Sequence, residues 1–236
     1  MAFLPETIRS VQMQSGADYE HIFVDGDSTD GTLEYLKTLP GNKLIVEGVG
    51  GGIARAMNEG IRVATGDVIA HMHSDDYYLG PQVFSKVLSV FEQTGCQWLF
   101  GRIMSDNDGV IAPESYAVPR YSYKRFQGRN FIPHPATFIR RKVFDECGVF
   151  SETLRYAMDY ELFLRIAKRY EPQQLDEHLA AFRRHDGSAT QANFMKSLAE
   201  DFEVRRMHAK WHQIPEATLR YLVRRQRHIK RIAANA

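Results

Sequence analysis

Val24-Asp25-Gly26-Asp27-Ser28-Thr29-Asp30-Gly31-Thr32 carries three carboxylates directly after an apolar run, and His73-Ser74-Asp75-Asp76-Tyr77 repeats that arrangement further along the chain. The apolar runs, residues 21–24 and 68–72, are short and bounded by glycine or charge, which is typical of buried strands. Carboxylates at strand ends lie in the crevice where open α/β sheets bind ligands. The sequence therefore predicts an α/β fold with a ligand site at the ends of two strands.

The two acidic stretches also predict a cation. Carboxylates that face one crevice repel one another unless a positive charge joins them. Mg²⁺ or Mn²⁺ is the expected cofactor, because both ions prefer oxygen ligands and often bind together with a nucleoside diphosphate. We therefore expect metal-assisted chemistry on a phosphorylated donor.

The composition excludes several classes of protein. The chain has 236 residues, of which 44% are hydrophobic, and this is typical of a soluble domain with a sizeable core. A net charge of +1 gives no general attraction to nucleic acid. Cys96 and Cys147 are isolated and lack metal-ligand spacing, and no apolar stretch approaches the ~20 residues of a membrane span. We expect a cytoplasmic protein without a signal peptide.

Strand and helix patterns alternate through the first hundred residues. This alternation predicts a mostly parallel sheet with helices on both faces. Residues 105–135, rich in Pro, Tyr and Arg, are interpreted as loops and edge structure. We expect an α/β domain over residues 1–190 and a helical extension over residues 191–236. The predicted strands are 21–24, 43–47, 68–72, 98–103 and 175–184, and the predicted helices include 5–14, 32–38, 53–64, one opened by Pro81, and 159–169.

Several ordered motifs, taken together, resemble the family 2 glycosyltransferases, which are inverting nucleotide-sugar transferases with a GT-A fold. The resemblance runs from about residue 6 to residue 185. Each motif alone is weak, and their order and spacing carry the resemblance. Besides the two acidic stretches, the motifs are Thr7-Ile8-Arg9-Ser10-Val11, Gly52-Ile53 through Ala56-Met57-Asn58-Glu59-Gly60, Ala64-Thr65-Gly66-Asp67, His134-Pro135-Ala136-Thr137-Phe138, Met158-Asp159-Tyr160-Glu161-Leu162 and Arg183-Arg184-His185.

The resemblance implies a function and a role for each motif. It implies transfer of a sugar from a nucleoside diphosphate donor to a hydroxyl of a glycan or lipid-linked acceptor, for surface polysaccharide. Asp159 would be the catalytic base, and Asp75 and Asp76 would bind the divalent metal. The donor would be contacted by Asp25, Asp27, Arg55 and Asp75, and the acceptor or diphosphate by His134, Arg183 and His185.

Structural interpretations of these residues remain open. Asp75 and Asp76 could begin a turn ahead of Pro81, and Asp159 could simply be a favourable charge at a helix N-terminus. Arg55 could be an exposed helical arginine. His134 could be a structural histidine, and residues 183–185 could be a solvated strand end.

Three departures from the family pattern support other functions. Family members usually begin with a strand that is central to the sheet, and we expect this chain to lack it. Gly26 stands where many members have a second carboxylate, and His73 takes the leading position of the DxD-like element. The alternatives are a non-catalytic nucleotide-sugar binding module and, with less support, a metal-dependent phosphohydrolase that uses Asp75, Asp76 and His73.

The C-terminal tail is basic. After Glu216 the chain has no acidic residue, and apolar residues recur in near-helical register. We expect an amphipathic helix that packs on the domain. The alternative is a helix that contacts the inner face of a membrane peripherally, because each basic residue adds about 1 kcal/mol of attraction to an anionic leaflet. The basic residues are Arg220, Arg224, Arg225, Arg227, Lys230 and Arg231, and the apolar ones are Leu219, Leu222, Val223, Ile229 and Ile232.

Overall fold

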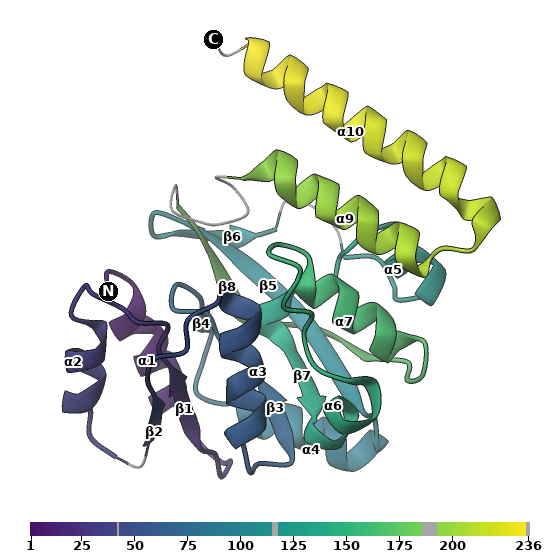
Figure 1. Ribbon diagram of the computed structural model, residues 1–236. Helices are drawn as coiled ribbons and strands as arrows, with labels where there is room; N and C mark the ends of the chain where they lie inside the picture. The colour runs from purple at the N-terminus through teal and green to yellow at the C-terminus, as the bar shows by residue number, and fades with distance from the viewer. Residues whose placement is uncertain (42, 115–117, 186–192, 235–236) are drawn as a thin grey trace.

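The computed structural model describes residues 1–41, 43–114, 118–185 and 193–234. They form an α/β body on which two long C-terminal helices lie (Figure 1). The α/β architecture with flanking helices and a helical C-terminus is as predicted. The strands are β1 (His21–Val24), β2 (Lys43–Val46), β3 (Val68–Ala70), β4 (Tyr77–Tyr78), β5 (Trp98–Asn107), β6 (Val110–Pro113), β7 (Thr137–Arg140) and β8 (Gln173–Arg184).

The helices follow the predicted apolar periodicity. Helix α3, for example, buries Ala54, Met57 and Ile61 on one face. Residues 105–135 contain β6 and α5 where only loops and edge structure were predicted. The helices are α1 (Leu4–Gln12), α2 (Thr32–Thr38), α3 (Ile53–Val63), α4 (Val83–Thr94), α5 (Tyr123–Gly128), α6 (Arg141–Cys147), α7 (Met158–Ala167), α9 (Phe194–His208) and α10 (Ile214–Ala234), with short 3-10 helices η1 (His134–Ala136) and η2 (Trp211–Gln213).

The strands pair in two separate groups. Strands β1 and β2 form a parallel pair, and the larger sheet has the order β3-β7-β5-β8-β4 with β6 added beside β5. Within the larger sheet only β5 and β8 run parallel, and the other pairs are antiparallel. The expectation of a mostly parallel sheet is therefore wrong, and the sheet is mixed. The physical reason is that β6 returns from β5 through a tight turn and β7 enters in the opposite direction to both of its neighbours.

The main hydrophobic core lies between the larger sheet and α7. Trp98, Phe126, Tyr160 and Phe163 are almost completely buried there. The indole N–H of Trp98 donates to the carbonyl of Tyr170 at 2.8 Å, so this large side chain is buried without an unpaired donor. The helix that carries the predicted base, α7, is thus anchored on six buried apolar or aromatic positions and is a rigid platform.

Strands β5 and β8 approach unusually closely at Gly101. A Cβ atom at this position would lie 2.5 Å from two side-chain atoms of Leu179 and 2.9 Å from the carbonyl oxygen of Glu177. The register between the two strands shifts on either side of Arg102, as in a β-bulge. Glycine is therefore required for this approach.

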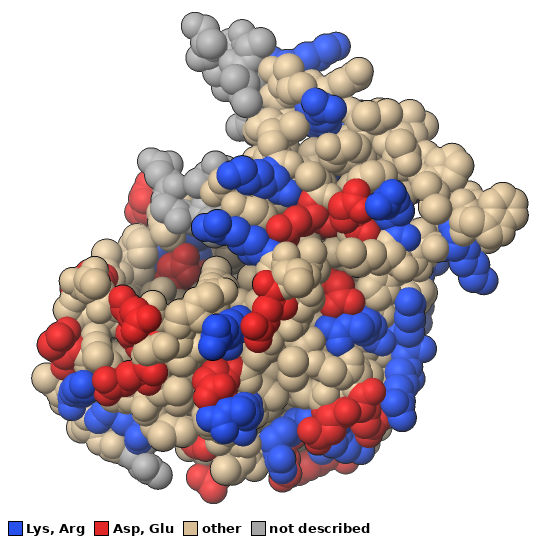
Figure 2. Space-filling view, viewed as in Figure 1, with Lys and Arg blue, Asp and Glu red and all other residues tan. Residues whose placement is uncertain are grey.

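The C-terminal helices pack on one side of the body. Helix α9 contacts α5 and α7, and α10 runs along α9 (Figure 1). The rings of Phe202 and Tyr221 stack between α9 and α10 with centroids 4.7 Å apart. In Figure 2, mixed acidic and basic side chains cover the α/β body, whereas α10 presents mainly basic and uncharged ones. The predicted boundary at residue 190 falls outside the described residues, so the division into two parts stays a prediction.

Among the helices that the structure describes, none is both long and apolar enough to cross a bilayer.

Candidate active site

Asp25 directly follows β1 and is held in place on several sides. Its side chain is only 5% exposed, and one carboxylate oxygen accepts the backbone N–H of Ser28 at 3.0 Å. Its backbone N–H donates to Val46 at 2.8 Å, and its carbonyl accepts from Val49 at 3.0 Å, which ties Asp25 to the end of β2. Asp27 follows in the left-handed conformation with φ of 67°, a conformation that Asp tolerates better than most residues. The two carboxylates therefore begin a tightly turned loop.

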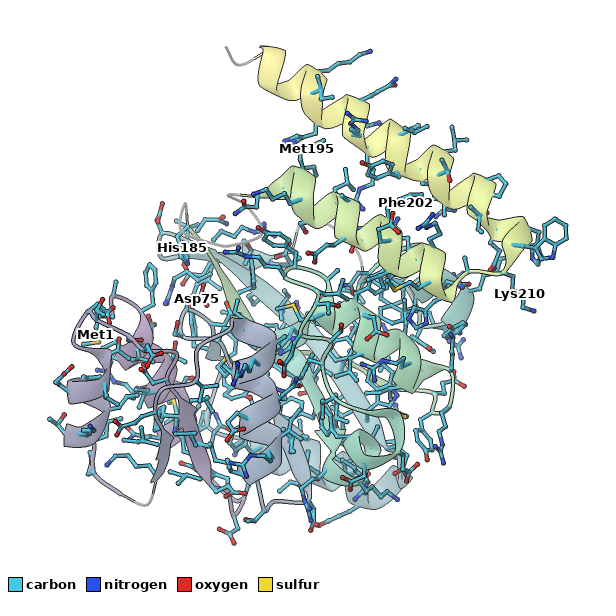
Figure 3. All side chains as sticks on the ribbon, in the orientation of Figure 1. Met1, Asp75, His185, Met195, Phe202 and Lys210 are labelled. Carbon is cyan, nitrogen blue, oxygen red and sulfur yellow. The ribbon has the colours of Figure 1, made fainter. Side chains whose placement is uncertain are left out.

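Asp75 and His185 form the second part of the site. Nε2 of His185 lies 2.9 Å from Oδ2 of Asp75, and the two side chains are 23% and 28% exposed. Figure 3 places them side by side, beyond the ends of β4 and β8. The ring of Phe3 packs on that of His185 with centroids 4.9 Å apart, and the amino group of Met1 contacts Asp30 at 2.8 Å. The residues before α1 thus connect the two acidic stretches.

Asp76, the predicted second metal ligand, turns inward instead. It is 1% exposed, and Oδ1 accepts the backbone N–H of Arg183 at 3.0 Å. The other oxygen, Oδ2, is buried with no hydrogen-bond partner within the described part of the chain. Burial, reinforced by the charge of Asp75, raises the pKa of Asp76 to about 8. The geometry therefore favours Asp75 over Asp76 as a metal ligand.

Arg183 is used inside the protein. Its guanidinium donates to Glu6 at 2.5 Å, to Asp106 at 3.4 Å and to the carbonyl of Asp75 at 3.1 Å. The hydroxyl of Tyr77 donates to the same Asp106 at 2.9 Å. Arg183 is 6% exposed and joins α1, β5 and the Asp75 turn, so its contacts hold these elements together. Its contact with acceptor or diphosphate stays a prediction.

Asp159 lies in the first turn of α7, where a negative charge is favourable. Oδ1 accepts the backbone N–H of Tyr160 at 2.6 Å, and the side chain is 21% exposed. Burial raises the pKa of Asp159 to about 6, although hydrogen bonds from Tyr160 and Asn130 oppose this shift. The carboxylate is therefore partly exposed, held in place, and more basic than an ordinary aspartate.

His134 belongs to a cluster of three half-buried histidines near Asp159. Its ring centroid lies 5.8 Å from that of His71 and 5.0 Å from that of His73. Nδ1 of His134 is 4.0 Å from Oδ2 of Asp159, a distance that would suit an ion pair. Burial, however, lowers the pKa of all three imidazoles, that of His71 to about 4. His134 thus faces Asp159 as a neutral ring at neutral pH.

Arg55 is exposed in the first turn of α3. Its side chain lies over Gly51 in the glycine-rich loop that precedes the helix. Its charge acts on Glu59, one turn further along α3. A role for Arg55 in donor binding stays a prediction.

Comparison with known proteins identifies the family of this chain. The family model described as glycosyl transferase family 2 matches residues 2–148, which is more than half of the chain. The chain belongs to glycosyl transferase family 2. An uncharacterized glycosyltransferase of Mycobacterium tuberculosis is 31% identical over 176 residues, covering 72% of this chain and 65% of its own length. A PGL/p-HBAD biosynthesis glycosyltransferase of Mycobacterium bovis is 27% identical over 169 residues, covering 70% and 64%. This family 2 chain thus spans about two thirds of the length of these relatives.

Solved structures agree on the fold. Staphylococcus aureus TarS, residues 1–349, in complex with UDP has a TM-score of 0.66 at 15% identity, covering 94% of this chain and 67% of its own. The mannosyltransferase PcManGT of Pyrobaculum calidifontis, in complex with GDP-Man and Mn²⁺, has a TM-score of 0.68 at 16% identity, covering 93% and 66%. The predicted GT-A fold of this family 2 chain is confirmed.

The family implies a divalent metal, and the residues present were tested against one. Within the described residues no group of three His, Cys, Asp or Glu side chains could hold a metal ion. Mg²⁺, however, is commonly held by one or two carboxylates, with waters and substrate phosphates as the other ligands. Asp75 is an accessible carboxylate of this kind and has His185 beside it. The site therefore fits a metal that is held jointly with the diphosphate of a donor.

Three residues near Asp159 escaped sequence analysis of this family 2 chain. Glu200 on α9 accepts the backbone N–H groups of Arg155, Tyr156 and Ala157 at 3.0, 2.6 and 3.0 Å, fixing the loop that leads into α7. The others are Asn130, a partner of the Asp159 carboxylate, and Asp201, whose negative charge raises the pKa of Asp159. Glu200 and Asp201 could have been noticed in the sequence as an adjacent acidic pair, in an extension that has no acidic residue after Glu216.

Proposed function

We propose that this chain is an inverting, metal-dependent glycosyltransferase. It moves a sugar from a nucleoside diphosphate donor to a hydroxyl of a glycan or lipid-linked acceptor in surface polysaccharide synthesis. The observation that carries the proposal is Asp159, a partly exposed carboxylate of raised pKa at the start of a rigid helix. Membership of glycosyl transferase family 2 and the relative named for PGL/p-HBAD biosynthesis support it.

Asp159 acts as the general base in this mechanism. Its carboxylate accepts the proton of the acceptor hydroxyl as the hydroxyl oxygen attacks the anomeric carbon from the side opposite the diphosphate. The bond between the anomeric carbon and the phosphate oxygen breaks, so the configuration inverts and the nucleoside diphosphate leaves. A base with a pKa near 6 is ionised at neutral pH and remains basic enough to accept the proton.

The strand-end carboxylates bind the donor. Asp25 and Asp27 face the nucleoside, with Asp25 held by Ser28 and the end of β2. Asp75 contacts the ribose and, with His185 beside it, would hold Mg²⁺ or Mn²⁺. That ion supplies positive charge against the charge that grows on the departing diphosphate. Arg183 keeps the Asp75 turn in position.

Nucleotide binding tests the donor site first. We expect one of UDP, GDP, dTDP and CDP to raise the melting temperature in the presence of Mn²⁺ and to do so much less in EDTA, because a ligand that binds only the folded state stabilises it by mass action. No stabilisation by any of the four would contradict an intact donor site.

Turnover tests the role of Asp159. We expect Asp159→Asn to keep the nucleotide-induced stabilisation and to lose sugar transfer by at least 10²-fold, the typical contribution of a general base. Full transfer activity in Asp159→Asn would contradict the role of Asp159 as the general base. Donor binding without transfer to any acceptor in the unaltered protein would instead indicate a non-catalytic nucleotide-sugar binding module, the alternative that Gly26 and His73 suggest. Metal-dependent phosphate release without transfer would indicate a phosphohydrolase.

We also propose that the protein acts in the cytoplasm and contacts the inner face of the membrane peripherally through α10. Leu219, Leu222 and Ile229 are 63%, 44% and 50% exposed on this helix. Arg225 and Lys230 are exposed near them. An apolar stripe flanked by basic residues suits the headgroup region of an anionic bilayer.

A further inference from the structure

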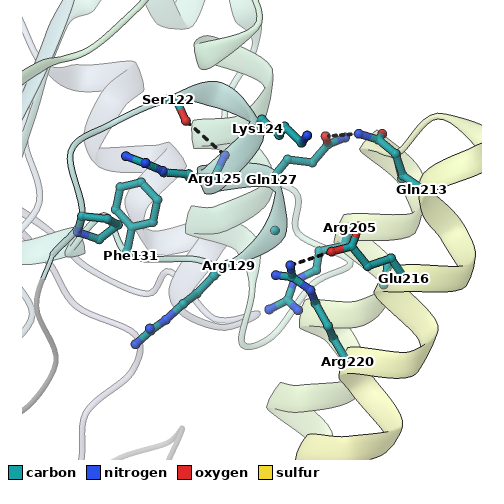
Figure 4. Close-up of a pocket in the computed structure, with 14 residues that line it drawn as sticks. Ser122, Lys124, Arg125, Gln127, Arg129, Phe131, Arg205, Gln213, Glu216 and Arg220 are labelled. Atoms are coloured by element: carbon teal, nitrogen blue, oxygen red, sulfur yellow. Dashed lines mark hydrogen bonds and ion pairs between the residues drawn. The ribbon is translucent and has the colours of Figure 1, made fainter.

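A pocket of about 520 Å³ lies between α5, α9 and α10 (Figure 4). Its volume is within the range of sites that bind small molecules. None of the residues predicted for the donor site lines it. We asked which ligand its chemistry would recognise.

The pocket has a strong excess of positive charge. Among the described residues, Glu216 is the only acidic one that lines it, and its carboxylate lies 2.6 Å from Arg220. Phosphate groups are recognised by such clusters, because guanidinium and ammonium groups donate charge-assisted hydrogen bonds to several oxygens at once. The basic residues that line the pocket are Lys124, Arg125, Arg129, Arg205 and Arg220.

Arg205 lines the pocket from α9 and is almost completely buried. It is 4% exposed and is held by Asp201 at 2.8 Å and by the ring of Tyr160, 5.9 Å below its guanidinium. Its Nε is buried and has no hydrogen-bond partner among the residues described in the structure. A buried donor without an acceptor is unfavourable. An anion in the pocket would give the Arg205 guanidinium, which lines it, a further acceptor besides Asp201.

The remaining lining combines apolar residues with the polar side chains of Ser122, Gln127 and Gln213. Of the apolar ones, Phe131 and Pro119 come from the segments around α5, Ala209 directly follows α9, and Ala217 belongs to α10. A ligand that fills this space needs an apolar portion next to its phosphate. Free inorganic phosphate would use only the basic part of the pocket.

The pocket and Asp159 share one short segment of chain. The carbonyl of Gln127, which lines the pocket, accepts the hydroxyl of Tyr160 at 2.8 Å. Asn130, between the lining residues Arg129 and Phe131, lowers the pKa of Asp159 through its side chain. We propose that this pocket binds a phosphate group attached to an apolar chain. Building on the proposed function, we assign that phosphate to the lipid-linked acceptor.

Direct binding tests this assignment. Farnesyl phosphate, farnesol and inorganic phosphate are titrated into the full chain in EDTA, which suppresses metal-dependent diphosphate binding at the donor site. We expect farnesyl phosphate to bind at least tenfold more tightly than farnesol. Lys124→Ala/Arg220→Ala should weaken farnesyl phosphate at least tenfold. The control Lys168→Ala/Arg206→Ala removes the same charges outside the pocket, with Arg206 also paired to a glutamate one turn away, and should change nothing.

Several results would overturn the proposal. Equal affinity for farnesyl phosphate and farnesol would show that the pocket does not recognise phosphate. Equal losses of farnesyl phosphate affinity in both double variants would show the same. If Lys124→Ala/Arg220→Ala weakened binding to phosphatidylglycerol vesicles but not to farnesyl phosphate, the phosphate would belong to a membrane phospholipid and the acceptor assignment would fall. Nucleotide stabilisation with Mn²⁺ is measured on the same proteins. Its absence would count against the donor site and leave the phosphate result standing.

Discussion

Asp75 and Asp76 are adjacent in sequence and have opposite surroundings. Asp75 reaches His185 at the surface, whereas Asp76 is buried against the backbone of Arg183. We therefore expect Asp75→Asn to abolish the Mn²⁺-dependent part of nucleotide stabilisation and Asp76→Asn to preserve it. Melting curves with one nucleotide, with Mn²⁺ or EDTA, measure both. Loss of the metal effect in both variants would show that Asp76 is a ligand as well.

The raised pKa of Asp159 predicts the pH dependence of transfer. A base must be deprotonated, so kcat/KM should fall tenfold per pH unit below about pH 6 and level off above it. Because His134 is neutral, His134→Gln should leave this apparent pKa unchanged, although activity falls if the ring positions the carboxylate. A clear increase of the apparent pKa in His134→Gln would mean that the histidine is charged.

The same pKa has a consequence for stability. The folded-state pKa of Asp159 is above the usual 3.8, so the folded state favours the protonated form. The contribution of Asp159 to the free energy of unfolding is therefore most favourable below about pH 4. It falls by at most about 3 kcal/mol as the pH rises to about 6 and the folded protein has to lose this proton. Asp159→Asn should remove that loss, and its melting temperature relative to the unaltered protein should rise between pH 4 and pH 6.

The residue types of the site could be predicted, and their environments could not. Asp25, Asp75 and Asp159 stand out because carboxylates follow apolar strands or open a helix in a family motif. Nothing in the sequence shows that Asp76 points inward or that Glu200 binds the loop before α7, because both depend on contacts between segments far apart in the chain. The burial of Arg183 among Glu6, Asp106 and the Asp75 carbonyl depends on such contacts as well.

At the scale of elements, the close contact between β5 and β8 depends on Gly101. Gly101→Ala forces its Cβ against Leu179 and Glu177, and we expect a loss of about 1–3 kcal/mol in the free energy of unfolding. For a chain of this size this loss lowers the melting temperature by a few degrees. Denaturant unfolding measures it directly.

Gly80→Ala is the matched control for this prediction. A Cβ at Gly80 would meet no atom within 4 Å, and the backbone there is not left-handed. Equal stability losses in the two variants would show that the strand approach at Gly101 is less tight than described.

The helices could be predicted far better than the sheet. Apolar residues at 3–4 spacing defined α3, α4 and α7 to within a few residues. Strand direction depends on which strands become neighbours, and β7 lies between β3 and β5 despite being distant from both in sequence. Local pattern contains no signal for such pairing, so parallel order was assumed where mixed order occurs.

For the whole molecule, α10 is the element that would meet a membrane. We expect binding to vesicles that contain phosphatidylglycerol, weakened by salt and absent with phosphatidylcholine alone. Leu222→Gln/Ile229→Gln should weaken it several-fold by removing apolar contact. Met207→Gln on α9, which also replaces an exposed apolar side chain, should have little effect. Co-sedimentation measures the unaltered protein and both variants, and equal binding by all three would rule out α10 as the contact.

The two tryptophans occupy opposite extremes of this molecule. Trp98 is completely buried in the core, whereas Trp211 is 83% exposed in η2, between α9 and α10. The protein therefore contains two intrinsic optical reporters. Iodide should quench the emission of Trp211 and leave that of Trp98 almost untouched, so a Trp211→Phe variant isolates core unfolding. A Trp98→Phe variant retains only the fluorophore at the turn between the two C-terminal helices. A shift of its emission maximum would report any rearrangement of α10 in real time.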